Sequence, residues 1–322
     1  MTPSMTDSAV KAAIQMISDA STQMEEKIGM LIEIAQGFCK KPKTENDLWN
    51  AIALFNQADK LSEQDYPLLK ARATVGKASA LKAIPQAGVE YLLQSRTAYQ
   101  KAIPVLEELA SSVETAEAQM NLGLVLQSLA SYNLAPIVDS IQIYQQALQI
   151  FTYSQYPQEY AILHNNIAIA YLSMSTGSQE QYLYEGLAIQ SFETALKYIN
   201  LIEHPTEYAM LQNNLGNALQ YVPSSHPFEN NLKAVQAYEE ALKVRTLRDT
   251  PLEYANTIAN QANALSNLPD DLEKPENGNS QKILQAIAYY QQSLDIFTQY
   301  NQQEQAEIII QAMQEIRSQN SE

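Results

Sequence analysis

The stretch Pro205–Gln220, PTEYAMLQNNLGNALQ, has two close copies elsewhere in the chain. PQEYAILHNNIAIAYL begins at Pro157 and PLEYANTIANQANALS begins at Pro251, which gives intervals of 48 and 46 residues. Weaker copies begin at Ser112 and Pro67, and both of these earlier intervals are 45 residues. Self-similarity at a fixed period is the signature of repeat architectures. The chain is therefore predicted to consist of repeats of 45 to 48 residues.

A second motif alternates with the first. It is a small residue, an aromatic residue four positions later, and a second small residue three positions after that. Offsets of four and seven fall on one face of a helix. Each repeat is therefore predicted to contain two helices, helix A with the first motif and helix B with the second. The copies are Ala51, Phe55 and Ala58; Ser95, Tyr99 and Ala102; Ser140, Tyr144 and Ala147; Ala188, Phe192 and Ala195; Ala234, Tyr238 and Ala241; and Ala286, Tyr290 and Ser293.

The strong copies of the first motif open with Pro-x-Glu. Proline is favoured as the first residue of a helix, and the helix dipole favours a carboxylate in the first turn. We therefore interpret the repeated glutamates as helix-start charges rather than as a catalytic set. Small residues at one shared position of helix A predict close packing of A against B. They are Ala78, Gly123, Ala168, Gly216 and Ala262.

The segments NNLGNAL, AVQAYEEALKVRT and PLEYA resemble the tetratricopeptide repeat. The repeat length is closer to the long variety found in kinesin light chains and in bacterial, especially cyanobacterial, repeat proteins. The resemblance implies an all-α, right-handed α-solenoid of about six helix pairs with the A helices on its concave side. We expect capping helices in residues 1–45, the repeats in 46–300 and a capping helix in 301–322.

Asparagines gather on a face of the A helices that differs from the apolar stripe. In related repeats this face lines a groove, and the asparagine before the Leu-Gly pair binds the backbone of an extended peptide. An amide suits that role because it both donates and accepts hydrogen bonds. Alternatively, the amides join neighbouring A helices or face water, and both roles can coexist. The predicted peptide-binding residues are Asn121, Asn165, Asn166, Asn213, Asn214, Asn217, Asn260 and Asn263.

The net charge of −16 makes nucleic acid an unfavoured partner, because phosphate binding depends on Lys and Arg. The charge fits an ordinary soluble surface, and attraction of a basic partner peptide is the alternative. Only Arg72 and Lys82 place cations on the asparagine face, which disfavours a clamp for a C-terminal carboxylate. The single cysteine, Cys39, excludes an internal disulfide and favours the cytoplasm. No secretory signal or membrane span is expected.

The sequence contains no phosphate loop, nucleophile elbow or zinc-ligand spacing. His164 lies beside the asparagines and is interpreted as a packing or groove-rim residue rather than a base. We therefore predict a non-enzymatic adaptor or scaffold that binds a protein or peptide without cofactor or metal. The alternatives are an assembly protein that associates through its end helices and a helical-repeat enzyme. The sequence does not predict the oligomeric state.

Overall fold

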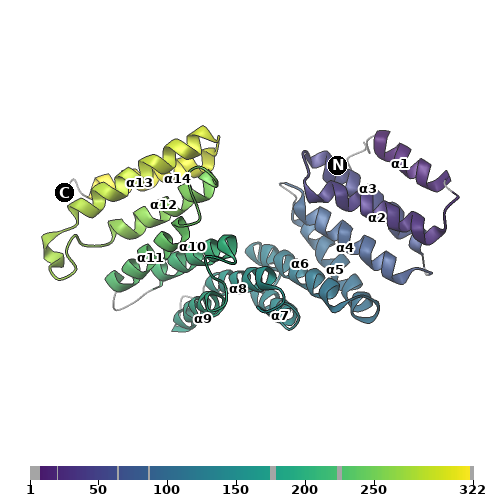
Figure 1. Ribbon diagram of the computed structural model, residues 1–322, viewed down its shortest axis with the longest axis horizontal. Helices are drawn as coiled ribbons and strands as arrows, with labels where there is room; N and C mark the ends of the chain where they lie inside the picture. Colours follow the sequence, from purple (N-terminus) through teal and green to yellow (C-terminus); the bar gives the residue numbers. More distant parts are fainter. Residues whose placement is uncertain are drawn as a thin grey trace. The chain divides into compact units, whose positions relative to one another are not determined.

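The computed structural model describes residues 8–19, 21–63, 65–85, 88–174, 179–222 and 227–319. This part of the chain is all-helical and contains no strand (Figure 1). The elements are α1 Ser8–Asp19, α2 Met24–Lys40, α3 Glu45–Ser62, α4 Pro67–Ala83, α5 Val89–Leu109, α6 Ser112–Ser131, α7 Ile137–Ala147, α8 Pro157–Leu172, α9 Gln179–Leu196, α10 Pro205–Tyr221, α11 Pro227–Leu242, α12 Pro251–Ser266, the 3₁₀ turn η1 Pro275–Asn277, α13 Ser280–Gln299 and α14 Gln303–Gln319.

The helices follow the predicted alternation of A and B. Each copy of the first motif begins a helix, because α4, α8, α10 and α12 have proline as the first helical residue and α6 begins at Ser112. Ser111 caps α6 by accepting a hydrogen bond from the backbone N–H of Glu114. The A helices are thus α2, α4, α6, α8, α10 and α12, and the B helices are α3, α5, α7, α9, α11 and α13.

The chain divides into two compact units. The N-terminal unit comprises Met1–Phe151 and the C-terminal unit comprises Thr152–Glu322. The division falls between a B helix, α7, and the next A helix, α8. Within each unit, helices that are consecutive in the sequence pack against each other (Figure 1).

The second motif forms the contact surface of every B helix. All its small and aromatic residues are buried, and the aromatic rings of Tyr99, Tyr144 and Tyr238 are fully inaccessible. The small position on helix A receives these rings. A Cβ added to Gly216 would lie 2.6 Å from the Tyr238 ring, and one added to Gly123 would lie 2.2 Å from the Tyr144 ring. The predicted close packing of A against B is confirmed at these positions.

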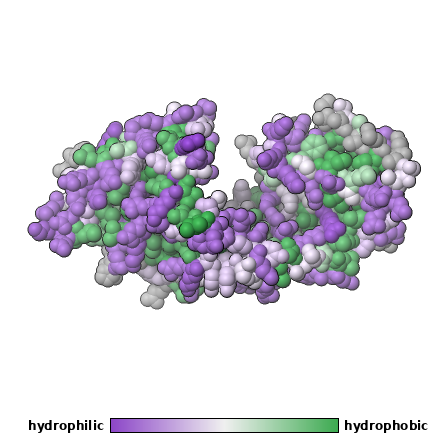
Figure 2. Space-filling view, viewed as in Figure 1, coloured by the Kyte–Doolittle hydropathy of each residue, from purple (hydrophilic) through white to green (hydrophobic). Residues whose placement is uncertain are grey.

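The A and B helices differ in how they contact neighbouring repeats. In the N-terminal unit α2 contacts α4 and α4 contacts α6, while in the C-terminal unit α8 contacts α10 and α10 contacts α12. In the described residues, the backbones of successive B helices do not approach as closely. The B helices α3 and α5 meet only through side chains, such as the edge-on rings of Trp49 and Tyr91 at a centroid distance of 5.5 Å. The A helices therefore lie on the more crowded side of each unit. Apolar cores run between the helices, and hydrophilic residues cover much of the face shown in Figure 2, with hydrophobic ones in bands between them.

Candidate functional site

Asparagine side chains join the A helices of the C-terminal unit into a hydrogen-bonded ladder. Asn214 of α10 donates from Nδ2 to Oδ1 of Asn165 in α8 at 2.7 Å. Within α10, Asn213 donates to Oδ1 of Asn214 at 3.0 Å, and within α8, Asn165 donates to Oδ1 of Asn166 at 3.3 Å. Because each amide accepts from one neighbour and donates to the next, the ladder has one direction, from α10 toward α8.

The ladder begins at α12. Asn260 donates from Nδ2 to Oδ1 of Asn213 at 3.4 Å, and the Thr257 hydroxyl lies 3.1 Å from the same oxygen. The Arg245 guanidinium donates to the Thr257 hydroxyl at 2.9 Å. Burial lowers the pKa of Arg245. The single proton of the Thr257 hydroxyl has a closer acceptor in the Glu253 carbonyl, at 2.8 Å, so Asn260 is the amide donor that begins the ladder.

The ladder ends at Asn166 in α8. This side chain is 8% exposed, and its Nδ2 has no hydrogen-bond partner among the described residues. Asn214 and Asn260 occupy the same repeat position as Asn166, and each donates to the first asparagine of the preceding pair. A buried donor without a partner costs about 1–3 kcal/mol, which an acceptor oxygen would relieve.

The remaining predicted asparagines lie outside this ladder. Asn217 accepts a hydrogen bond from the Tyr238 hydroxyl at 2.7 Å, so its oxygen serves the contact between α10 and α11. Asn263 is partly buried in α12. Asn121 belongs to the N-terminal unit. Five of the eight predicted residues are thus brought together, namely Asn165, Asn166, Asn213, Asn214 and Asn260.

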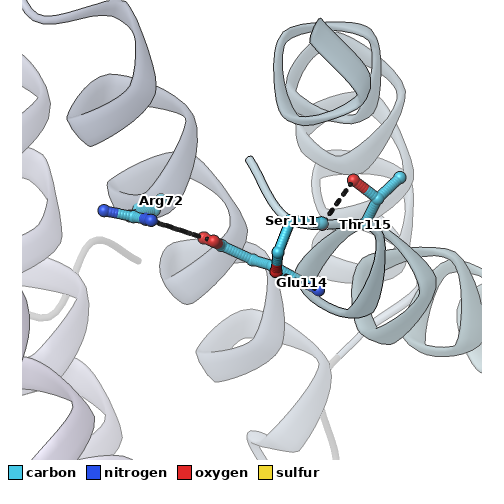
Figure 3. A network of polar contacts seen from close by, with 4 residues as sticks. All are labelled: Arg72, Ser111, Glu114 and Thr115. Atoms are coloured by element: carbon cyan, nitrogen blue, oxygen red, sulfur yellow. Dashed lines mark hydrogen bonds and ion pairs between the residues drawn. The ribbon is translucent and has the colours of Figure 1, made fainter. Parts of the chain in front are cut away.

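The A face of the N-terminal unit carries a pocket of about 470 Å³ instead of an amide ladder. It lies between α2, α4 and α6, and Cys39, Arg72, Glu114 and Asn121 are among its lining residues. Arg72 of α4 donates to both carboxylate oxygens of Glu114 in α6, at 2.7 and 3.0 Å (Figure 3). This ion pair bridges two successive A helices across the pocket wall.

The cap of α6 positions Glu114. Its backbone N–H donates to the hydroxyl of Ser111 at 3.2 Å, and the Thr115 hydroxyl donates to the Ser111 carbonyl at 3.3 Å (Figure 3). The Glu114 hydrogen bond to the guanidinium raises the pKa of Arg72. The glutamate therefore does two things, because it complements the start of its own helix and also holds the preceding A helix.

A second cation approaches the same face. Lys82 of α4 donates from Nζ to Oδ1 of Asn121 at 2.9 Å, and Asn121 donates from Nδ2 to the Glu117 carbonyl at 2.9 Å. Burial lowers the pKa of Lys82. Burial raises the pKa of the Cys39 thiol to about 11, so this pocket residue stays protonated at neutral pH.

His164 packs toward the B side of its repeat. Its Nδ1 lies 3.0 Å from the Ser191 hydroxyl of α9, which also donates to the His164 carbonyl. The ring meets Tyr160 edge-on at a centroid distance of 4.5 Å. Burial lowers the pKa of His164 to about 4. The packing interpretation from the sequence agrees with these contacts.

The sequence placed Arg72 and Lys82 on the asparagine face but did not identify their partners. Glu114 was not singled out, and Asn121 was assigned only to a peptide ligand. A usable signal exists, since Arg72 is a cation at a position that is Ile162 in α8 and Met210 in α10. A cation at this position of helix A is therefore a sequence signal for an ion pair with the first-turn glutamate of the next A helix.

No protein-family description matches the chain. No curated protein matches it either. Among the described residues, no helix is both long enough and apolar enough to cross a membrane. The same residues contain no group of three His, Cys, Asp or Glu side chains placed to hold a metal ion.

Proposed function

We propose that the protein is a non-enzymatic adaptor that binds an extended segment of a partner protein along its A helices. The proposed architecture is a right-handed α-solenoid of about six tetratricopeptide-type helix pairs. The repeat period, the alternation of A and B helices and the direct contacts between successive A helices support it. Stacked helix pairs of this kind present an extended surface to their ligands.

The observation that carries the proposal is the unpaired donor of Asn166. An extended peptide offers backbone carbonyl oxygens, and one such oxygen would satisfy the Nδ2 group after the Asn166 side chain turns this buried atom toward the ligand. The ladder behind Asn166 is held by its own hydrogen bonds, so binding needs to reorient this one side chain and leaves the other amides in place.

The remaining properties of the proposed adaptor follow from composition. The net charge of −16 favours a partner segment with basic residues through electrostatic steering. The single, partly buried cysteine fits the reducing conditions of the cytoplasm. Nucleic acid is disfavoured as a partner because its phosphates would be repelled, and binding of a peptide to amides requires no cofactor.

The test is capture of partners from a cell lysate with wild type and two single variants, followed by crosslinking to locate the contact. Asn166→Ala removes the unpaired donor at one end of the ladder, and the control variant Asn46→Ala changes an exposed asparagine of the B helix α3. We expect Asn166→Ala to lose the captured protein and Asn46→Ala to retain it, with crosslinks on α8 and α10. Equal capture by wild type and Asn166→Ala, with matching thermal unfolding, would refute the proposal.

Self-association through the end helices is the alternative. The last helix, α14, buries Ile309 and Met313 but leaves Ile308 58% exposed and Ile310 42% exposed. Light scattering after size exclusion would distinguish the two functions. A dimer that Ile308→Lys/Ile310→Lys converts to a monomer would support assembly, and a wild-type monomer would exclude it.

A further inference from the structure

A second groove, in addition to the pocket between α2, α4 and α6, lies away from the A face. It has a volume of about 890 Å³ and lies in the N-terminal unit, over α4 and between the B helices α3 and α5. Its floor is apolar and includes Ala73, Leu81, Leu93 and Val105. Ligand pockets commonly measure ~300–1,000 Å³. The groove therefore has room for a small organic molecule.

The repeat explains why the groove is present here. In the C-terminal unit, the fourth residue of each of the A helices α8, α10 and α12 is a tyrosine, and in α10 and α12 this tyrosine donates a hydrogen bond to its own B helix. Tyr208 donates to Glu240 of α11 at 2.9 Å, and Tyr254 donates to Gln292 of α13 at 3.4 Å. These two contacts bridge helices A and B on the side of the repeat where α4 carries the groove.

Two lysines occupy the equivalent positions in α4 and α5. Lys70 is the fourth residue of α4 and thus corresponds to Tyr208 and Tyr254. Lys101 lies two residues after Tyr99 of the second motif and thus corresponds to Glu240 and Gln292. Two lysines thus replace the hydrogen-bonded pair that joins helices A and B in the last two repeats. Because their like charges repel, Lys70 and Lys101 do not bond to each other across the groove.

The floor of the groove also carries different side chains from those at the equivalent positions of other repeats. Ala73 stands where α8 and α10 carry Leu163 and Leu211, which are fully buried. Lys77 stands where α10 carries the buried Leu215. The groove therefore results from smaller side chains at its floor and from lysine at positions that are apolar or hydrogen-bonded in other repeats.

The lysines have no anionic partner within the described part of the chain. None of Lys70, Lys77 and Lys101 forms an ion pair, and the hydrogen bond of the Lys70 ammonium goes to the Glu63 backbone carbonyl at 3.4 Å. The lining also contains three carboxylates. Asp59 and Glu63 belong to α3, and Glu90 lies in the first turn of α5, eleven residues before Lys101. All three lysines of the lining belong to α4 and α5, beside its apolar residues.

We propose that this groove binds a small organic carboxylate with an apolar body. The carboxylate lies between Lys70 and Lys101, in the place of the hydrogen bonds that Tyr208 and Tyr254 make in their repeats. The apolar body of the ligand covers the floor beside Leu93 and Val105. Charge-assisted hydrogen bonds to two ammonium groups supply the specificity for an anion. This site is separate from the A face and does not depend on the proposed adaptor function.

Isothermal titration with octanoate, acetate and octanol tests the site, since the three probes separate the charged head from the apolar body. We expect the wild-type protein to bind octanoate more tightly than octanol and to show no measurable binding of acetate. The variant Lys70→Tyr/Lys101→Glu installs the pair found in the C-terminal unit. It should weaken octanoate binding by about tenfold or more, because both charge-assisted bonds are removed.

The control variant Lys243→Tyr/Lys233→Glu makes the same change in net charge on exposed positions of α11 and beyond its end. It should bind octanoate as wild type does. Lys101→Met is a second, milder variant that removes one charge and keeps an apolar side chain of similar length. Weaker octanoate binding by this variant would show that the loss of affinity does not come from a folding defect in the double variant. Equal binding of octanoate by wild type and Lys70→Tyr/Lys101→Glu would overturn the proposal, and so would a wild type that prefers octanol.

Discussion

Asn214 and Asn165 are 49 residues apart in the sequence, yet the Nδ2 of the first donates to the Oδ1 of the second at 2.7 Å. This is the shortest bond of the amide ladder and the one that joins helices α8 and α10. Asn214 also accepts from Asn213, so a single side chain satisfies groups on two helices. The ladder is therefore a structural element of the C-terminal unit as well as the proposed ligand surface.

Asn214→Ala should destabilise the protein by about 1–3 kcal/mol, since it leaves a buried acceptor on Asn165 and a buried donor on Asn213 without partners. Urea unfolding measures the difference. Asn56→Ala in α3 is a matched control, because this exposed asparagine sits in a helix away from the ladder. The control should match or slightly exceed wild type, as Ala is the better helix former. A cost below ~0.5 kcal/mol for Asn214→Ala would show that the ladder contributes little.

Substitutions at Gly216 should become more harmful as the side chain grows. The Tyr238 ring above it is held by hydrogen bonds of its hydroxyl with Asn217 and Gln220, so it cannot move freely. We expect Gly216→Ala to cost about 1 kcal/mol and Gly216→Val about 3 kcal/mol in the free energy of unfolding, through overpacking.

Gly29 of α2 provides the control for this series, because an added Cβ would meet no atom within 4 Å. Gly29→Ala should stabilise the protein by up to about 1 kcal/mol through helix propensity alone. Ala168 and Ala78 show that an alanine is accommodated in other repeats. A Gly216→Val variant as stable as wild type would mean that α11 shifts at no cost.

Stability should fall between pH 6.5 and about 4 because of His164. Burial holds the pKa of the folded state at about 4, below the ordinary value of 6.5, so the unfolded chain binds the proton first as the pH falls. The stabilisation from neutral His164 is complete above pH 6.5 and is lost as the pH falls to 4, on the order of 3 kcal/mol at most.

His164→Gln isolates this effect. Unfolding free energies of both proteins at pH 7 and pH 5 should show a smaller decrease for the variant, whose side chain does not titrate. An NMR titration of the ring protons should place the midpoint of His164 well below that of a solvent-exposed histidine. A midpoint near 6.5 would contradict the buried position of the ring.

The ion pair of Arg72 and Glu114 should contribute less than about 1 kcal/mol, because its side chains are 40% and 28% exposed. A double-mutant cycle with Arg72→Met and Glu114→Gln measures the coupling energy. The coupling should decrease at 1 M salt, where exposed charges are screened. A coupling that is unchanged by salt would indicate a water-excluded pair, and a coupling of zero would remove its role in joining α4 to α6.

The regular part of the fold was accessible from the sequence. The starts of α8, α10 and α12 follow from proline, which is tolerated at a first helical residue and disfavoured within a helix. The B-helix faces follow from triplets such as Ala234, Tyr238 and Ala241, since small and aromatic residues at offsets of four and seven can only share one side. Both signals are local in the sequence, and the array of repeats shows each of them several times.

The hydrogen-bond partners were not accessible in the same way. The asparagines on the A face could be recognised, but whether Asn214 points to Asn165 or to a ligand depends on the distance between two A helices, which the sequence does not contain. The two lysines of the groove were also missed. Lys70 and Lys101 are unremarkable surface residues until the hydrogen bond between Tyr208 and Glu240 shows what their positions do elsewhere.

The one-way order of the amide ladder gives the repeat a polarity that matters for its evolution by duplication. A duplicated helix pair that carries adjacent asparagines, as α10 does with Asn213 and Asn214, brings both a new donor and a new acceptor and lengthens the ladder without any further change. A duplicated α12 would interrupt it, because Ala259 replaces the first asparagine of the pair. A copy of α10 would thus extend the ladder, whereas α12 can occupy only its first position, because it donates through Asn260 and has no first asparagine to accept.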